Sequence, residues 1–180
     1  FGRINYDYKG IYLLELSGRY DGSSKFPSHT QWAFFPSGSL GYRISEEAYF
    51  QEAKQYVSNL KLRASYGTIG NQEIGSYMFL ETMNKGQVSW LGAGDSKYYY
   101  FGTPNLVDPA LTWETIATAN VGIDLGFFNN DLNVNFDWYQ RTTTGMLAPG
   151  QELPKVLGAS AAYENAGSLR TRGWELNIDW

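Results

Sequence analysis

Apolar and polar side chains alternate with a period of two along most of this chain. Between residues 12 and 20, Tyr12, Leu14 and Leu16 fall on one side of the alternation. Glu15 and Arg19 fall on the other. Successive side chains of a β-strand point to opposite faces, so each alternating run predicts one strand. The runs cover residues 3–8, 12–20, 32–44, 60–67, 113–125, 132–141 and 174–180. The chain is therefore predicted to be all-β, with about seven strands.

The connections between these runs differ in length in a regular way. Connections over residues 9–10, 45–58 and 128–131 alternate with loops over 21–31, 69–111 and 143–167, and two of these loops are much longer than any other connection. Ser45 is a candidate N-cap for a short helix in the segment 45–58. The loop over 69–111 is so long that we expect it to be functional or to contain a small hairpin. Short turns at one end and long loops at the other are typical of outer-membrane β-barrels.

The two faces of the predicted strands differ in chemistry. One face has no acidic or basic residue over the central part of each strand, whereas the other mixes charges such as Arg63, Asp124 and Asp137. Trp and Tyr gather near the strand ends, as aromatic rings do at the two interfaces of a membrane. The pattern predicts an antiparallel transmembrane β-barrel segment. Its lipid-facing aromatic girdle is expected to include Tyr12, Tyr42, Trp113, Trp138, Trp174 and Trp180.

Arg170 and Arg172 are exceptions, because they fall on the apolar side of the last alternating run. We expect them to lie above the hydrocarbon or to follow a β-bulge. A soluble β-protein, with one face on a core and the other in water, is the alternative architecture.

Composition excludes several classes of function. The chain has no Cys, one His (His29) and a net charge of −4. Thiol chemistry and a Cys or His metal site are therefore not expected, and neither is a nucleic-acid partner. Ser58 and Lys61 have the Ser-x-x-Lys spacing of penicillin-binding enzymes, but Lys61 begins an alternating strand. We predict no enzyme, metal or cofactor. The mean hydropathy of −0.38 averages an apolar and a charged face.

An aromatic cluster lies in the longest predicted loop. Sugars stack on aromatic rings, so these side chains are candidates for contact with a ligand or with a partner protein. The alternative is that the rings pack the loop against itself. The candidates are Trp90, Tyr98, Tyr99, Tyr100 and Phe101.

Five blocks of sequence, in order, resemble SusC/RagA-type TonB-dependent outer-membrane transporters, and the resemblance covers nearly the whole chain. The most distinctive block is Leu60-Lys-Leu-Arg-Ala-Ser-Tyr-Gly-Thr-Ile-Gly-Asn-Gln72. The others are Arg19-Tyr-Asp-Gly-Ser-Ser-Lys-Phe26, Phe35-Pro-Ser-Gly-Ser-Leu-Gly-Tyr-Arg-Ile-Ser-Glu-Glu47, Asp108-Pro-Ala-Leu-Thr-Trp-Glu-Thr115 with Asn120-Val-Gly-Ile-Asp-Leu-Gly-Phe127, and Asn165-Ala-Gly-Ser-Leu-Arg-Thr-Arg-Gly-Trp-Glu-Leu176.

The resemblance implies part of a 22-stranded, plugged barrel with long extracellular loops and short periplasmic turns. Residues 1–180 would be a later part of the barrel domain, without the plug domain and the TonB box. The chain begins at Phe1 without a signal peptide, so we expect a piece of a longer protein.

Such transporters import oligosaccharides or peptides across the outer membrane of Gram-negative bacteria. They act with a SusD-like surface lipoprotein and draw energy through TonB. Two alternatives stay open at this point. One is a small outer-membrane barrel that serves as an adhesin or anchor, and the other is a soluble β carbohydrate-binding module.

Overall fold

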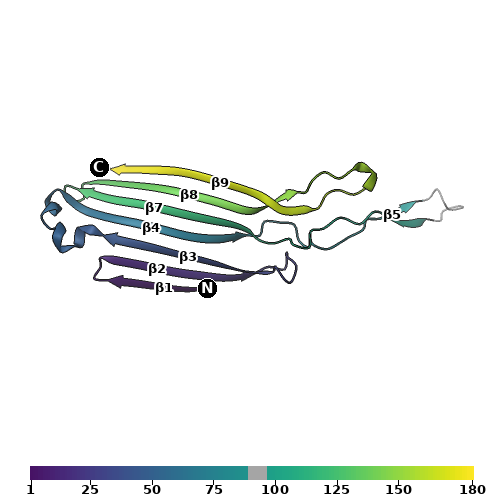
Figure 1. Cartoon of the computed structure of the whole chain (residues 1–180), viewed down its shortest axis with the longest axis horizontal. Helices are drawn as coiled ribbons and strands as arrows, with labels where there is room; N and C mark the ends of the chain where they lie inside the picture. Colours follow the sequence, from purple (N-terminus) through teal and green to yellow (C-terminus); the bar gives the residue numbers. More distant parts are fainter. Residues whose placement is uncertain (89–96) are drawn as a thin grey trace.

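The computed structural model describes residues 1–88 and 97–180. One antiparallel sheet of seven strands forms the body of the molecule, in the order β1-β2-β3-β4-β7-β8-β9 (Figure 1). This arrangement confirms the predicted all-β, antiparallel fold. The strands are β1 (Gly2–Tyr8), β2 (Tyr12–Gly22), β3 (Trp32–Arg43), β4 (Val57–Asn71), β7 (Glu114–Phe127), β8 (Leu132–Pro149) and β9 (Tyr163–Asp179).

The strand register keeps the two kinds of side chain on opposite faces across the whole sheet. Directly paired residues of neighbouring strands point to the same side. One row of direct partners crosses all seven strands and is apolar throughout: Tyr6, Leu14, Leu40, Ala64, Val121, Trp138 and Trp174. We call this side the apolar face and the opposite side, which carries Arg63, the polar face. A shift of one residue in any pair would exchange them.

Tight turns join β1 to β2 and β7 to β8 at one end of the sheet, the turn end. Between β1 and β2, Lys9 and Gly10 have φ values of 57° and 68°. The Gly10 amide donates a 2.7 Å hydrogen bond to Asp7 Oδ1. Between β7 and β8, Phe128, Asn129 and Asn130 also have positive φ. The described part of the chain contains no helix with the length and hydropathy needed to cross a membrane.

The prediction of one helix after Ser45 is wrong. The segment forms three short 3-10 helices, η1 (Ile44–Glu46), η2 (Ala48–Phe50) and η3 (Ala53–Gln55). Ser45 lies inside η1 and is buried. Glu47 is extended between η1 and η2, with ψ of 146°. The Glu47 carboxylate accepts hydrogen bonds from the Tyr12 and Tyr42 hydroxyls at 2.7 and 3.2 Å. These long-range bonds draw Glu47 toward the sheet, and its extended backbone interrupts helical hydrogen bonding.

The opposite end, the loop end, has longer strands than the sequence pattern predicted. β8 continues to Pro149 and β9 begins at Tyr163, so the last loop is shorter than 143–167. A register shift at Met146, beside Gly145 with φ of 68°, breaks the alternation there. The loop between β4 and β7 contains a hairpin of β5 (Lys85–Val88) and β6 (Tyr98–Phe101). The last loop holds η4 (Lys155–Leu157).

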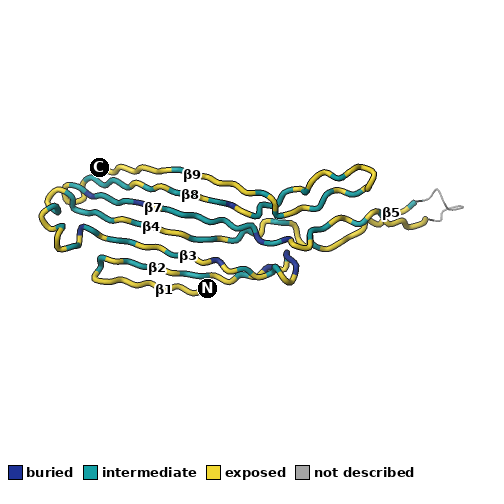
Figure 2. Tube along the Cα trace, in the orientation of Figure 1, coloured by how far each residue is buried: buried dark blue, intermediate teal, exposed yellow. Residues whose placement is uncertain are grey.

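The buried apolar residues gather where the loops meet the sheet. Figure 2 shows few buried residues along the strands and a group of them at the loop end. Trp113 is only 7% exposed, and its ring lies 5.0 Å from that of Phe26 and 5.6 Å from that of Phe35. Its Nε1 donates to the Gln31 carbonyl at 3.2 Å. Partly buried side chains surround this core, among them Ala33, Ile74, Met78, Phe79 and Leu147.

This burial corrects the placement of Trp113 in the lipid-facing girdle. Strand parity assigned Trp113 to the apolar face, but β7 begins one residue later, at Glu114. Because Trp113 precedes the strand, the alternation does not decide which way its ring points. The ring fills the loop core instead.

One polar side chain ties three segments of the loop end together. Asn165 of β9 donates hydrogen bonds from Nδ2 to the carbonyls of Thr112 and Gly145, at 2.9 and 2.7 Å. Its Oδ1 accepts one from the Thr112 amide at 2.9 Å. Asn165 thus replaces backbone pairing where the register shifts, and it holds the end of the β4–β7 loop against β8 and β9.

We predict that Asn165→Leu loosens this junction in the full-length protein. The substitution keeps the branched shape of the side chain but leaves partly buried backbone groups without partners, which costs roughly 1–3 kcal/mol. Limited proteolysis should cleave the loop over residues 72–113 faster than in the unsubstituted protein. Asn177→Leu is the matched control, since among the described residues the Asn177 side chain bonds to the Asp179 carboxylate alone. Equal cleavage rates for both variants would contradict the assigned role of Asn165.

Candidate functional site

Aromatic rings mark two levels on the apolar face. Toward the turn end, Tyr12 stacks on Tyr42 with ring centres 5.1 Å apart, and Trp180 meets Phe128 edge-on at 6.5 Å. Toward the loop end, Trp138 is the direct partner of Trp174. Tyr20 and Trp32 stack at 5.2 Å and prolong this second level on β2 and β3. Most of these rings are strongly exposed, with Trp174 at 68%.

The loop-end level of rings does not follow one row of direct partners but crosses the rows at an angle. The row of direct partners through Trp138 and Trp174 reaches β2 at Leu14, whereas the β2 ring of this level is Tyr20. Six residues along a strand are about 20 Å, and the four strand spacings between these positions are about 19 Å. The line of rings is therefore inclined to the rows by roughly 45°.

The turn-end level is inclined in the same sense. The row through Tyr12 and Tyr42 reaches β9 at Leu176, four residues before Trp180. Over the five strand spacings from β2 to β9, about 24 Å, this offset of about 14 Å corresponds to an inclination of roughly 30°. The two values bracket the strand tilt of about 35–45° in transmembrane barrels. Both ring levels fit one tilted wall.

A cluster that sequence reasoning missed anchors the turn-end rings. The Tyr42 hydroxyl lies 2.9 Å from that of Tyr49 in η2, and Glu47 accepts from both Tyr12 and Tyr42. The cluster joins β2, β3 and the η1–η3 segment across up to 35 positions of sequence. No local spacing predicts such a contact.

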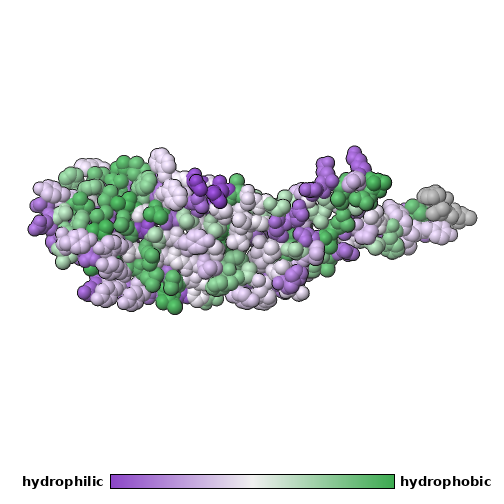
Figure 3. All heavy atoms as spheres, in the orientation of Figure 1, coloured by the Kyte–Doolittle hydropathy of each residue, from purple (hydrophilic) through white to green (hydrophobic). Residues whose placement is uncertain are grey.

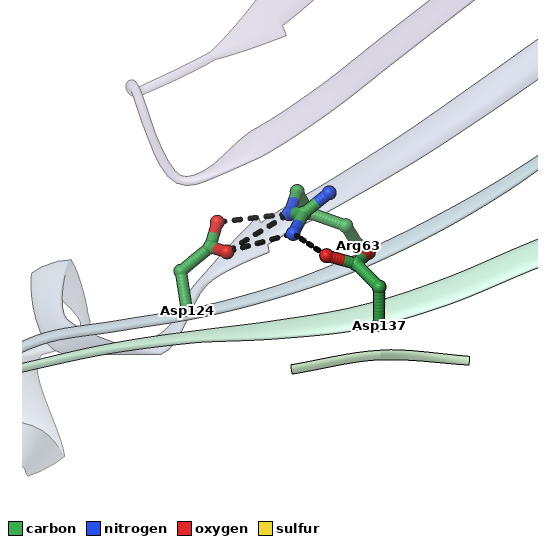
Figure 4. A network of polar contacts seen from close by, with 3 residues as sticks. All are labelled: Arg63, Asp124 and Asp137. Carbon is green, nitrogen blue, oxygen red and sulfur yellow. Dashed lines mark hydrogen bonds and ion pairs between the residues drawn. The ribbon is translucent and has the colours of Figure 1, made fainter. Parts of the chain in front are cut away.

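The polar face carries an ion-pair network in place of a catalytic arrangement. Arg63 donates to both carboxylate oxygens of Asp124, at 2.8 to 3.1 Å, and to Asp137 at 3.0 Å (Figure 4). Gly122 lies between Arg63 and Asp137 in the register. A Cβ there would clash with Asp137 Oδ1 and crowd the Arg63 guanidinium, so glycine leaves the pair room. The network links β4, β7 and β8.

Metal binding has no support in the described residues, which contain no group of three potential acidic or His ligands placed to hold an ion. Asp137 Oδ1 is buried and has no hydrogen-bond partner among them. The Asp124 and Asp137 carboxylates serve the ion pairs with Arg63.

Four of the five predicted contact aromatics lie together on one strand. Tyr98, Tyr99, Tyr100 and Phe101 form β6, and their exposed fractions lie between 51% and 66%. The Lys85 ammonium lies 3.7 Å from the centre of the Tyr99 ring, and Tyr100 covers Gly86. The β5–β6 hairpin extends beyond the loop end, away from the sheet (Figure 1). Trp90, the fifth candidate, lies outside the described residues.

The fold and these surfaces define a segment of a transmembrane β-barrel wall. Figure 3 shows hydrophobic residues gathered over the turn-end parts of β7, β8 and β9, with hydrophilic residues beside them on the loop side. The whole chain, residues 1–180, matches the family described as "TonB dependent receptor-like, beta-barrel". The chain belongs to this family. Its members lie in the outer membrane of Gram-negative bacteria and are transporters, not enzymes.

Relatives with known names agree with this assignment. The chain is 35% identical over 183 residues to TonB-dependent receptor SusC of Bacteroides thetaiotaomicron, covering 99% of this chain and 18% of that protein. It is 34% identical over 179 residues to TonB-dependent receptor P3 of Formosa agariphila, covering 99% of this chain and 17% of that protein. The chain thus spans less than a fifth of the length of these curated relatives.

Solved structures show the same fold. The RagAB peptide importer in its closed-closed state superposes with a TM-score of 0.82 at 32% identity, over 98% of this chain and 18% of that chain. The open-open state of the same importer gives the same TM-score and identity.

Proposed function

We propose that residues 1–180 are part of the barrel domain of an outer-membrane TonB-dependent active transporter. The plug domain and the TonB box would belong to other parts of the full-length protein. The transporter would import oligosaccharides or peptides together with a SusD-like surface lipoprotein, with energy supplied through TonB. The names of the relatives support this proposal, since one is SusC and another is a peptide importer.

The observation that carries the proposal is the wall itself, with one apolar face and two open edges. β1 and β9 lie at opposite ends of the strand order, and among the described strands each has a neighbour on one side only. Unpaired backbone groups are not tolerated in hydrocarbon. The wall is therefore proposed to continue on both sides in further strands of a larger barrel. This favours a transporter segment over a small self-contained barrel.

The two aromatic levels of the apolar face are proposed as the girdles at the two membrane interfaces. Tyr12 and Tyr20 are eight residues apart on β2, about 27 Å at the rise of an antiparallel strand. At the inclination derived above, this is about 19–23 Å along the membrane normal, close to the apolar band of about 25 Å in outer-membrane barrels. Of the six residues predicted for the girdle, the proposal keeps Tyr12, Tyr42, Trp138, Trp174 and Trp180.

The β5–β6 hairpin is proposed as a contact surface for the substrate or the surface lipoprotein. A two-stranded hairpin alone is marginally stable in water, and this one exposes aromatic rings on both of its faces. Exposed aromatic clusters are the usual anchors of protein interfaces and of sugar stacking. The loop core at Trp113 lies outside the hairpin, so packing within the loop leaves these four rings uncovered.

We predict that Val134→Arg destabilises the full-length receptor in a lipid bilayer by roughly 2–4 kcal/mol. Val134 lies on the apolar face between Leu125 and Ile178, between the two aromatic levels. Unfolding by guanidinium from lipid vesicles measures the change. Asn135→Arg is the control at the same depth on the polar face, where a cation is tolerated. Equal stability of the Val134 variant and the unsubstituted receptor would contradict the lipid-facing assignment.

We predict that Tyr99→Ala combined with Tyr100→Ala weakens binding of the lipoprotein or of the substrate at least tenfold. Truncation of a central aromatic anchor removes about 2 kcal/mol or more of binding free energy. Calorimetric titration of the purified full-length receptor measures both affinities. Tyr56→Ala provides the control, because Tyr56 is equally exposed but lies at the turn end. Unchanged affinity for both partners would remove the hairpin from the proposal.

A further inference from the structure

Arg170 and Arg172 occupy positions that a lipid-facing surface should not give to a cation. They are direct partners of Thr142 and Gln140, and they lie on the same face of β9 as Trp174. Both are exposed. An arginine at the bilayer midplane of a barrel costs roughly 2–4 kcal/mol, and this cost falls to about 0–1 kcal/mol near the interface. The depth of Arg170 and Arg172 in the bilayer therefore decides whether these two positions are destabilising.

The inclination of the sheet places both arginines outside the apolar band. Along the direct-partner row, Arg172 corresponds to Leu16 of β2, which lies between the two ring levels at Tyr12 and Tyr20. On β9, however, the loop-end level is already reached at Trp174. Arg172 lies two residues beyond that ring and Arg170 four, about 7 and 14 Å along the strand. This is the level of lipid headgroups. The register shift lies farther on, at Met146, so no bulge turns these side chains inward.

The chemical surroundings leave both guanidinium groups available. Arg172 Nε donates to Gln140 Oε1 at 2.8 Å, which holds the group against the wall through one of its nitrogens. Within residues 1–88 and 97–180, neither guanidinium is within ion-pair distance of a carboxylate. By contrast, Arg3, Arg19 and Arg63 each lie within 3.4 Å of a carboxylate oxygen. The neighbouring apolar-face positions of β7, β8 and β9 are neutral: Ala117, Ala119, Thr142, Thr144 and Ser168.

We propose that Arg170 and Arg172 form a binding site for the phosphate group of a membrane lipid in the leaflet next to the long loops. A guanidinium presents a planar fork that binds two phosphate oxygens at once. Side chains two positions apart on one face of a strand lie about 7 Å apart, so both forks reach one phosphorylated headgroup. The lipid's acyl chains then run down the wall past Trp174 and Leu176. The inference rests on the proposed lipid-facing role of the apolar face.

The test compares the R170Q/R172Q variant of the full-length receptor with the unsubstituted protein. The probe is short-chain phosphatidic acid, and binding is measured by native mass spectrometry in a phosphate-free detergent. We expect the double variant to bind this lipid at least tenfold more weakly. R141Q is the matched control, because Arg141 is adjacent on β8 but lies on the polar face; its lipid affinity should be unchanged. The single variants R170Q and R172Q should each lose part of the affinity, and they keep the test decisive if the double variant fails to fold.

Two results would overturn the inference. One is equal retention of phosphatidic acid by the arginine variants and the unsubstituted receptor. The other is binding of inorganic phosphate as tightly as of the lipid, which would indicate a site for free anions. The outcome is separable from that of the proposed function. If Val134→Arg is destabilising while the arginine variants keep the lipid, the wall faces lipid and only the phosphate site is wrong.

Discussion

Backbone N–H and C=O groups have no water to bond with inside a membrane, so a strand wall must pair all of them and turn only apolar side chains outward. This constraint accounts for the period of two that runs through the sheet. It explains why the polar face collects charges such as Asp124 and Asp137, whose carboxylates both accept hydrogen bonds from Arg63 across three strands. It also explains why little of the sheet is buried in the ordinary sense. In the proposed orientation the apolar face makes its hydrophobic contacts with lipid, and the compact core of the described residues lies at the loop end around Trp113.

Strand inclination links the register to the depth of each residue. Residues in one direct-partner row lie at different depths, because the rows climb relative to the membrane plane. Leu16 and Arg172 share a row, yet the first lies between two aromatic levels and the second beyond one. The inclination of the wall thus accounts for Arg170 and Arg172, the two cations on the apolar side of the alternation.

Strands and faces were predictable from sequence because both depend on local alternation, which Leu14, Leu16 and Glu15 already display. Features that depend on long-range contacts were not predictable. Trp113 follows the parity of β7 in sequence but precedes the strand, and Phe26 and Phe35 draw it into the loop core. Glu47 lies in the segment predicted to contain a helix, but its carboxylate accepts hydrogen bonds from Tyr12 and Tyr42 and its backbone is extended. The predicted last loop, residues 143–167, is too long because the register shift at Met146 interrupts the alternation of side chains there. The aromatic rings of β6 are proposed as contacts from their residue type, and no local pattern specifies the direction of the hairpin.

The central claim is that the even-numbered residues at the start of β8 face lipid and the odd-numbered ones do not. Single cysteines placed from Leu132 to Thr142 in a cysteine-free version of the full-length receptor, each carrying a nitroxide label, test it in lipid bilayers. Accessibility to oxygen, which concentrates in hydrocarbon, should be high at 132, 134, 136 and 138, low at the odd positions between them, and reduced again from 140 onward. Equal oxygen accessibility at odd and even positions, or preferential access of a water-soluble nickel reagent to the even ones, would contradict the account.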